Sequence, residues 1–261
     1  MQVTHFLIAL IEKIRIAALR AGPYYCPICQ RSYSRFLSMG TPPRPHSRCP
    51  GCNSLERHRL LWVSLARLQA QGVLSKGGRL LHIAPEACLA KILRKDFEYV
   101  SVDICAPEAQ IRTDIGALCF SDQCFDAIIC NHVLEHVPDD RRALSELHRV
   151  LKQGGWGSIQ VPMKGDETQE NPAVIDPAER QRLYGQADHV RQYGDDFRAR
   201  LREAGFDVIE LQKKDILDPI ELERLSVACE KSVILVRKGG AGNTRHTDGA
   251  MTGCHGSIES G

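Results

Sequence analysis

The pattern of apolar and polar residues along the chain changes at Arg79. From there to Arg237, short apolar runs alternate with segments of helical periodicity. This alternation is typical of buried parallel strands joined by helices, so it predicts a doubly wound α/β sheet. Two late strands follow one another, which suits one antiparallel member. The predicted strands are Arg79–Ala84, Tyr99–Ile104, Ile111–Thr113, Phe125–Cys130, Trp156–Val161, Phe206–Leu211 and Ser232–Arg237, and the predicted helices are 86–95, 139–152 and 195–204.

Before Arg79 the pattern predicts two helices with a cysteine-rich segment between them. The first spans His5–Arg20 and is expected to pack on the body or to join two chains in a homo-oligomer. The second spans Ser54–Gln71, with Ser54 as its N-cap. The last 24 residues are Gly-rich and polar, and are expected to be disordered. The predicted divisions are an N-terminal helix at 1–22, a cysteine module at 23–53, a linking helix at 54–78, the α/β domain at 79–237 with an irregular insert at 163–193, and a tail at 238–261.

Composition narrows the class of protein. The 261 residues are 43% hydrophobic and 25% charged, which is typical of a globular chain. No run of 18 apolar residues predicts a membrane-spanning helix, and the N-terminus lacks the features of a signal peptide. The eleven cysteines are odd in number and mostly scattered, which favours a reducing, cytoplasmic compartment over a disulfide framework.

Charge is divided unevenly along the chain. Residues 1–78 carry 11 Lys and Arg against two acids, whereas residues 79–237 carry 21 against 28. A basic front on an acidic body could meet a polyanion such as nucleic acid. Residues 1–78 contain no dense block of Lys and Arg, so nucleic acid is a possible partner but not the favoured one.

Four cysteines have the spacing of a metal site. Cys26-Pro-Ile-Cys29 and Cys49-Pro-Gly-Cys52 are two C-x-x-C turns, each able to aim two sulfurs at one ion. Together they predict a zinc ribbon with a structural Zn²⁺. Four thiolates leave no open position on the metal, so the site is expected to support folding and not catalysis. His46 is interpreted as an exposed loop residue.

Acidic residues occur where predicted strands end. In doubly wound sheets, ligands bind beyond the carboxyl ends of the strands. Asp103 ends the second predicted strand, where a carboxylate can accept both hydroxyl groups of a ribose. Asp114 follows the third and could face an adenine amino group. Two acids at successive strand ends favour a nucleoside site, although such residues also serve as helix caps.

The run Phe125-Asp-Ala-Ile-Ile-Cys-Asn-His-Val-Leu-Glu-His-Val, with Ala143-Leu-Ser-Glu-Leu-His-Arg-Val-Leu-Lys-Gln-Gly-Gly after it, resembles class I S-adenosylmethionine-dependent methyltransferases of the type 11 group. The segment from Asp114 to Asp122 resembles the part of that group that lines the adenine. The cysteine turns, Ser54-Leu-Glu-Arg-His-Arg and His189-Val-Arg-Gln-Tyr-Gly are similar to a bacterial subgroup with an N-terminal zinc ribbon. The resemblance covers roughly 79–212. It implies a Rossmann-like methyltransferase sheet, S-adenosylmethionine as cofactor, and a cofactor site at His82, Ala84, Pro85, Glu86, Asp103, Ile104, Asp114, Ile115, Asn131 and His132.

The first loop departs from the pattern of that family. Members end their first strand with Asp-x-Gly-x-Gly-x-Gly, whereas His82 here replaces the acid. Ala84, Glu86 and Cys88 replace the three glycines. A residue with a Cβ restricts positive φ, and Pro85 lacks a backbone donor. Glu86 could contact the ammonium group of the cofactor, but it would also repel the carboxylate.

The insert at 163–193 supplies the candidate catalytic residues. It follows the carboxyl end of the fifth predicted strand and is placed to cover the site. His189 is the first candidate for general base, because an ordinary histidine titrates near neutral pH, and the alternative is a histidine that only holds the insert in place. Glu170 and Tyr193 are weaker candidates, and Arg180 or Arg191 could bind an anionic substrate. The polar insert favours a polar small-molecule acceptor.

The sequence is compatible with three functions. The favoured one is methyl transfer to oxygen or nitrogen of a polar small molecule. One alternative is an RNA (ribosomal RNA) methyltransferase that uses the basic zinc module to bind RNA, and the other is a catalytically weak binding or scaffold protein. The motif His132-Val-Leu-Glu135-His136 also fits the pattern of inverted zinc peptidases, but it follows a buried strand and not the long helix that those enzymes require.

Overall fold

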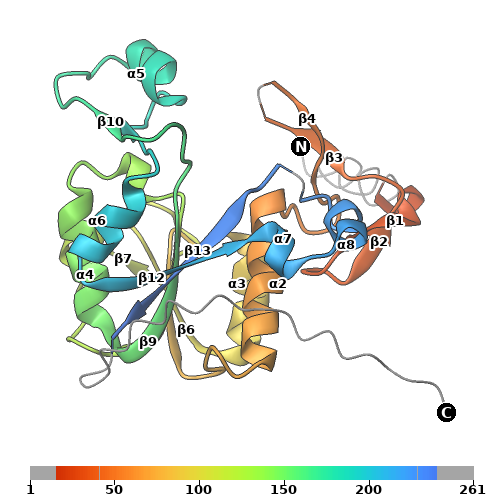
Figure 1. Ribbon diagram of the computed structural model, residues 1–261, viewed down its shortest axis with the longest axis horizontal. Helices are drawn as coiled ribbons and strands as arrows, with labels where there is room; N and C mark the ends of the chain where they lie inside the picture. The colour runs from red at the N-terminus through yellow and green to blue at the C-terminus, as the bar shows by residue number, and fades with distance from the viewer. Residues whose placement is uncertain (1–15, 41, 228, 240–261) are drawn as a thin grey trace, which may run out of the picture.

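A computed structural model describes residues 16–40, 42–227 and 229–239. Its centre is a seven-stranded sheet in the order β12-β13-β9-β8-β5-β6-β7 (Figure 1). The strands β5 to β9 are parallel, and β13 is antiparallel to both of its neighbours. This is the predicted doubly wound, Rossmann-like sheet, and its antiparallel member β13 lies second from one edge, between β12 and β9. The strands are β5 (Arg79–Ile83), β6 (Glu98–Asp103), β7 (Ile111–Arg112), β8 (Phe125–Asn131), β9 (Leu151–Gln160), β12 (Phe206–Gln212) and β13 (Ser232–Lys238).

Helices cover both faces of the sheet because alternate residues of each strand point to opposite sides. Leu80 packs in one buried cluster with α2 (Glu56–Ala70) and α3 (Ala87–Asp96), whereas Leu81 packs in the other with α4 (Asp140–Val150) and α6 (Phe197–Glu203). Near-continuous apolar strands are therefore buried on both sides, as the sequence pattern predicts.

The N-terminal module consists of two short antiparallel pairs. The strand β1 (Arg20–Cys26) pairs with β2 (Arg31–Tyr33), and β3 (Leu37–Met39) pairs with β4 (Arg44–Arg48). Figure 1 shows this module beside α2 and next to α7 (Lys213–Ile216) and α8 (Pro219–Arg224). Tyr33 and Phe36 share the core cluster that contains Leu80 of the sheet. The module is thus packed onto the α/β domain by a common apolar core.

Three sequence predictions about local structure are wrong. His46 is not an exposed loop residue, because it lies half-buried in β4 and its ring stacks on that of Tyr24. Helix α2 begins at Glu56, and Leu55 is its N-cap residue, so Ser54 does not cap it. The Ser54 hydroxyl lies against two cysteine sulfurs instead. The predicted irregular stretch at 163–190 contains β10 (Gln169–Glu170) and α5 (Pro177–Tyr184), and α5 is capped by Asp176.

Some predictions concern residues outside the described ranges. Most of the predicted N-terminal helix His5–Arg20, and the tail from residue 240 onward, belong to this group. Within the ranges that the structure describes, no helix is long and apolar enough to cross a membrane.

Candidate cofactor site and four-cysteine centre

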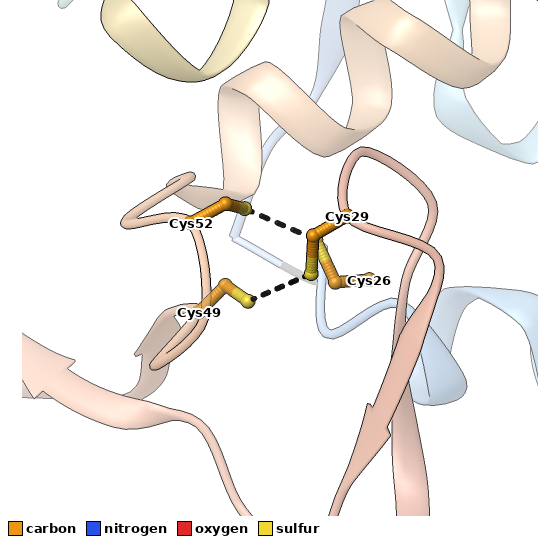
Figure 2. A group of neighbouring side chains, drawn as sticks. All are labelled: Cys26, Cys29, Cys49 and Cys52. Carbon is orange, nitrogen blue, oxygen red and sulfur yellow. Dashed lines mark hydrogen bonds between the residues drawn. The ribbon is translucent and has the colours of Figure 1, made fainter. Parts of the chain in front are cut away.

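The two C-x-x-C turns bring their four sulfurs together. Figure 2 shows Cys26 and Cys29 on one loop facing Cys49 and Cys52 on the other. The Cys26 and Cys52 sulfurs are 3.6 Å apart, those of Cys29 and Cys49 are 3.7 Å apart, and all four lie within 4.8 Å of one another. A tetrahedral zinc ion with Zn–S bonds of about 2.3 Å requires sulfurs roughly 3.8 Å apart. The site therefore has the dimensions of a Cys₄ zinc centre.

Polar groups around the sulfurs support this geometry. The Ser54 Oγ lies 3.3 Å from the Cys26 sulfur and 3.2 Å from the Cys52 sulfur. The Tyr33 hydroxyl lies 3.8 Å from the Cys29 sulfur, and a Cβ at Gly51 would collide with that hydroxyl. Such outer-shell contacts orient metal ligands, so Ser54 and Gly51 have roles beyond the cysteine spacing itself.

The thiols perturb one another strongly. Hydrogen bonds from the other thiols, that of Cys29 first, hold the pKa of Cys26 well below its ordinary value. The same contacts, that with Cys26 first, raise the pKa of Cys49 and of Cys52. Four thiolates so close together repel one another, and a divalent cation removes that repulsion.

Arg59 fastens this module to the rest of the chain. The side chain is fully buried and donates hydrogen bonds to the carbonyls of Ser47, Ser54, Leu225 and Ser226 at 2.7–3.0 Å. Its guanidinium also lies 4.5 Å from the centre of the Phe36 ring. One α2 side chain thus joins the second cysteine turn to the segment after α8.

The loop after β5 has a backbone conformation that favours glycine, but it contains no glycine. Ala84 follows β5 with φ of 46°, in the left-handed region that favours glycine, and its N–H donates to Val102 O. A residue with a Cβ therefore holds a strained turn at the position where the resembled family has its first glycine.

His82 and Glu86, the other departures in this loop, belong to a buried network. His82 Nε2 lies 2.6 Å from Glu86 Oε2, and its Nδ1 lies 2.9 Å from the Tyr99 hydroxyl. His58 of α2 places Nε2 3.5 Å from Glu86 Oε1. Burial opposes ionisation of Glu86, but the hydrogen bonds and charges of His58 and His82 outweigh it and hold its pKa well below the ordinary value. The two imidazoles therefore stabilise the ionised form of Glu86 within the chain.

The two predicted nucleoside carboxylates sit at the expected strand ends. Asp103 Oδ1 accepts hydrogen bonds from the N–H groups of Cys105 and Ala106 at 2.7 and 2.8 Å. Partial burial opposes ionisation, but these backbone donors outweigh it and lower the pKa of Asp103. Asp114 is exposed and caps a short 3-10 helix, η1 (Ile115–Ala117), through Gly116 N. Both carboxylates are thus fixed at the edge formed by β6 and β7.

Apolar and amide groups complete this edge. Ile104, beside Asp103, is 59% exposed, which is unusual for a large apolar side chain, whereas Ile115 is buried. Asn131, at the carboxyl end of β8, accepts a hydrogen bond from Ser158 Oγ at 3.0 Å. Its buried Nδ2 has no hydrogen-bond partner among the described residues. An unpaired buried donor at the end of β8, together with carboxylates and an exposed apolar side chain after β6 and β7, fits a polar ligand with a flat apolar part.

The insert at 163–193, called the lid below, is held by ion pairs. Glu170 lies 2.8 Å from both Arg191 and Arg200, and these hydrogen bonds, that from Arg200 first, lower its pKa to about 2. The buried Tyr193 hydroxyl donates to Asp140 Oδ2 at 2.6 Å, and burial and the Asp140 charge raise its pKa. Glu170 and Tyr193 thus have structural partners, which makes either a poor general base.

The arginines of the lid are also engaged. Arg191 is 4% exposed and donates to the carbonyls of Leu134, Val137 and Pro138. Arg180 donates to Val174 O at 3.0 Å. These contacts favour a role in shaping the lid over one in binding an anionic substrate.

His189 differs from the other candidates. It is 3% exposed, its Nδ1 lies 3.0 Å from Tyr184 O, and its buried Nε2 has no hydrogen-bond partner in the described part of the chain. A neutral imidazole that donates through Nδ1 leaves Nε2 as an acceptor. Of the three predicted catalytic residues, His189 alone keeps such a free atom.

Known proteins support the assignment of the fold. Residues 73–159, which span β5 to β9, match the family model described as "Methyltransferase domain". No curated protein matches the chain. The fold and the matched segment together define a methyltransferase-type Rossmann fold over these strands.

The solved structures that are similar to this chain share little sequence with it. A Bacillus halodurans C-125 protein described as a methyltransferase is 19% identical, with a TM-score of 0.42, and the match covers 67% of this chain and 98% of that one. The 1,6-didemethyltoxoflavin-N1-methyltransferase of Burkholderia thailandensis, solved with S-adenosylhomocysteine, is 16% identical, with a TM-score of 0.47 and coverage of 69% and 78%. The [4+2]-cyclase SpnF is 15% identical, with a TM-score of 0.45 and coverage of 92% and 94%.

Proposed function

We propose that the protein is an S-adenosylmethionine-dependent methyltransferase that acts on oxygen or nitrogen of a polar small molecule and carries a structural zinc ion. The observation that carries the proposal is the agreement between two independent features. The segment 73–159 matches a methyltransferase domain, and the carboxyl edge of its strands presents Asp103, Asp114 and the unpaired Asn131 amide. S-adenosylmethionine, when bound, supplies a methyl group on a positively charged sulfur.

The residues of the edge have separate tasks in this proposal. Asp103 would accept hydrogen bonds from the ribose hydroxyls, Asp114 would face the adenine, and Ile104 would contact its face. Ala84, Pro85 and Glu86 would follow the methionine part, with Asn131 and His132 on the opposite side. His58 and His82 already contact the carboxylate of Glu86, which holds this side chain within the loop.

The lid would exclude water and position the acceptor. Its backbone is tied to the end of β8 by Val190 N donating to Glu135 O at 2.8 Å, and its buried arginines fix its shape. We assign the handling of the acceptor proton to His189, the predicted catalytic residue with a free ring nitrogen. Positioning and proton removal are the two contributions that methyl transfer requires of the protein.

The acceptor class is tested with the methyl-labelled cofactor. The purified zinc-loaded protein is incubated with labelled S-adenosylmethionine and a cell extract that contains both RNA and metabolites, which are then separated by size. We expect label in the small-molecule fraction, and none with the Asp103→Ala variant. Label confined to RNA would replace the proposal with the RNA methyltransferase alternative, and label in neither fraction would favour a binding or scaffold protein.

A further inference from the structure

Three residues outside the cysteine centre converge between the end of β8 and the lid. Glu135 and His136 belong to the 3-10 helix η2 (Leu134–His136), which comes shortly after β8, and His189 belongs to the lid. One potential ligand atom of each lies within 4.8 Å of the others. The hydrogen bond from Val190 N to Glu135 O holds the two segments together.

Each histidine already has a partner on one ring nitrogen. His189 Nδ1 faces Tyr184 O at 3.0 Å, and His136 Nδ1 faces Asp188 Oδ2 at 3.2 Å. The rings lie nearly perpendicular, with centres 4.8 Å apart. Metal-bound histidines characteristically hold their second nitrogen against a carbonyl or a carboxylate, which fixes the tautomer and the ring. Both histidines thus have the outer-shell contacts of a metal ligand, with Nε2 left for the ion.

Glu135, the third residue, likewise has one partnered atom and one free atom. Glu135 Oε1 lies 3.3 Å from His132 Nδ1, whereas the buried Oε2 has no hydrogen-bond partner among the described residues. Glu135 is 1% exposed and His189 is 3% exposed, and the Nε2 of His189 is likewise unpartnered. Buried polar atoms normally have hydrogen-bond partners, so two unpartnered atoms in one cluster indicate that the cluster binds a ligand. His136, with 37% of its side chain exposed, connects the cluster to solvent.

We propose that Glu135, His136 and His189 bind a divalent transition-metal ion. Two imidazoles and one carboxylate suit Mn²⁺, Fe²⁺ or Zn²⁺, and three protein ligands leave positions open for a substrate oxygen. His132 is the outer-shell partner of Glu135 in this site. In this site His132 is not a metal ligand, whereas the inverted zinc peptidase pattern would use both His132 and His136 as ligands.

The position of the ion deepens the proposed function, on which this step rests. The site lies just beyond Asn131 and His132, so an ion there would bind the oxygen of a hydroxylated acceptor and lower its pKa. The hydroxyl proton leaves to solvent, and an oxygen lone pair forms the new O–CH₃ bond. The electron pair of the broken S–CH₃ bond returns to sulfur and yields the thioether. In this site His189 serves as a metal ligand, so activation of the acceptor hydroxyl by the ion takes the place of proton removal by a free ring nitrogen of His189. The acceptor class then narrows to hydroxylated small molecules.

Manganese binding tests the site separately from the cysteine centre. Mn²⁺ is added to the full-length, zinc-loaded protein, and free Mn²⁺ is followed by its electron paramagnetic resonance signal. Mn²⁺ prefers oxygen and nitrogen to thiolate ligands, so it reports the Glu–His cluster. We expect about one Mn²⁺ per chain, with affinity weakened at least tenfold in His136→Gln. The matched control, His148→Gln, alters a histidine that packs against Phe206 and should bind Mn²⁺ like the wild type.

Two readouts keep the outcomes distinct. Circular dichroism establishes that each variant is folded, and S-adenosylhomocysteine binding is measured on the same samples. No Mn²⁺ binding by the folded wild type, or equal binding by His136→Gln, would overturn the metal site whether or not the nucleoside binds. The protein could instead bind Mn²⁺, with weaker binding by His136→Gln, and yet fail to bind S-adenosylhomocysteine. That result would support the metal site and would count against methyl transfer.

Discussion

Replacing Cys49 by serine should remove one bound zinc ion per chain and unfold the N-terminal module. The strands β2 and β3 of the module have three residues each, and few of its side chains are buried, so the ion is expected to supply much of its stability. Structural zinc in small domains contributes about 10 kcal/mol or more of apparent binding free energy. Because the module shares its core with Leu80 of the sheet, the thermal unfolding midpoint of the whole chain should also fall. Elemental analysis and calorimetric unfolding measure the two effects.

The matched control for this experiment is Cys119→Ser. Cys119 is exposed and lies outside the cysteine cluster, so its replacement should leave zinc content and unfolding temperature unchanged. A Cys49→Ser protein that still holds one zinc ion, or that unfolds at the wild-type temperature, would contradict the structural role of the centre.

Replacing Arg59 by methionine should destabilise the chain by about 3 kcal/mol. Methionine retains much of the apolar stem but removes the donors to four carbonyls, at a net cost of about 1 kcal/mol for each hydrogen bond. Burial lowers the pKa of Arg59, so relief of this burial cost offsets part of the loss. Urea unfolding of the zinc-loaded protein measures the change.

Arg57→Met is the comparison for this second experiment. Arg57 lies on the same helix and is only partly buried, and we expect a change below about 1 kcal/mol. Equal destabilisation by the two substitutions would show that the effect belongs to α2 generally, and would remove the special role of Arg59 in joining the module to the segment after α8.

The sheet could be predicted from sequence because buried parallel strands leave a strong signal. The apolar runs Leu80-Leu81 and 127–130 lie at the centres of Arg79–Ile83 and Phe125–Asn131, and the structure ends these strands within one residue of the predicted positions. The lid helix α5 was missed because its pattern is polar, with Tyr184 as its one buried residue. The sequence Asp176-Pro177 was an available signal, since Asp at the N-cap and Pro at the first position are typical of a helix start.

The candidate site was only partly visible in the sequence. Strand-end acids such as Asp103 follow from the parallel sheet, and the cysteine spacing predicted one cluster. The role of His58 could not be predicted, because α2 approaches Glu86 only in the folded chain. His189 likewise meets Glu135 and His136 through a contact between distant segments. Pairings of this kind depend on tertiary packing, which a local pattern does not encode.

The most direct test of the proposed function is calorimetric titration of S-adenosylhomocysteine into the zinc-loaded protein, with Asp103→Ala as the comparison. Asp103 would hold the ribose, so its loss should weaken micromolar binding at least tenfold, or about 1.4 kcal/mol. Micromolar binding by the wild type, weakened to this extent in a folded variant, is the predicted result. No detectable binding to well-folded wild-type protein would contradict the proposal that this chain is a free-standing methyltransferase.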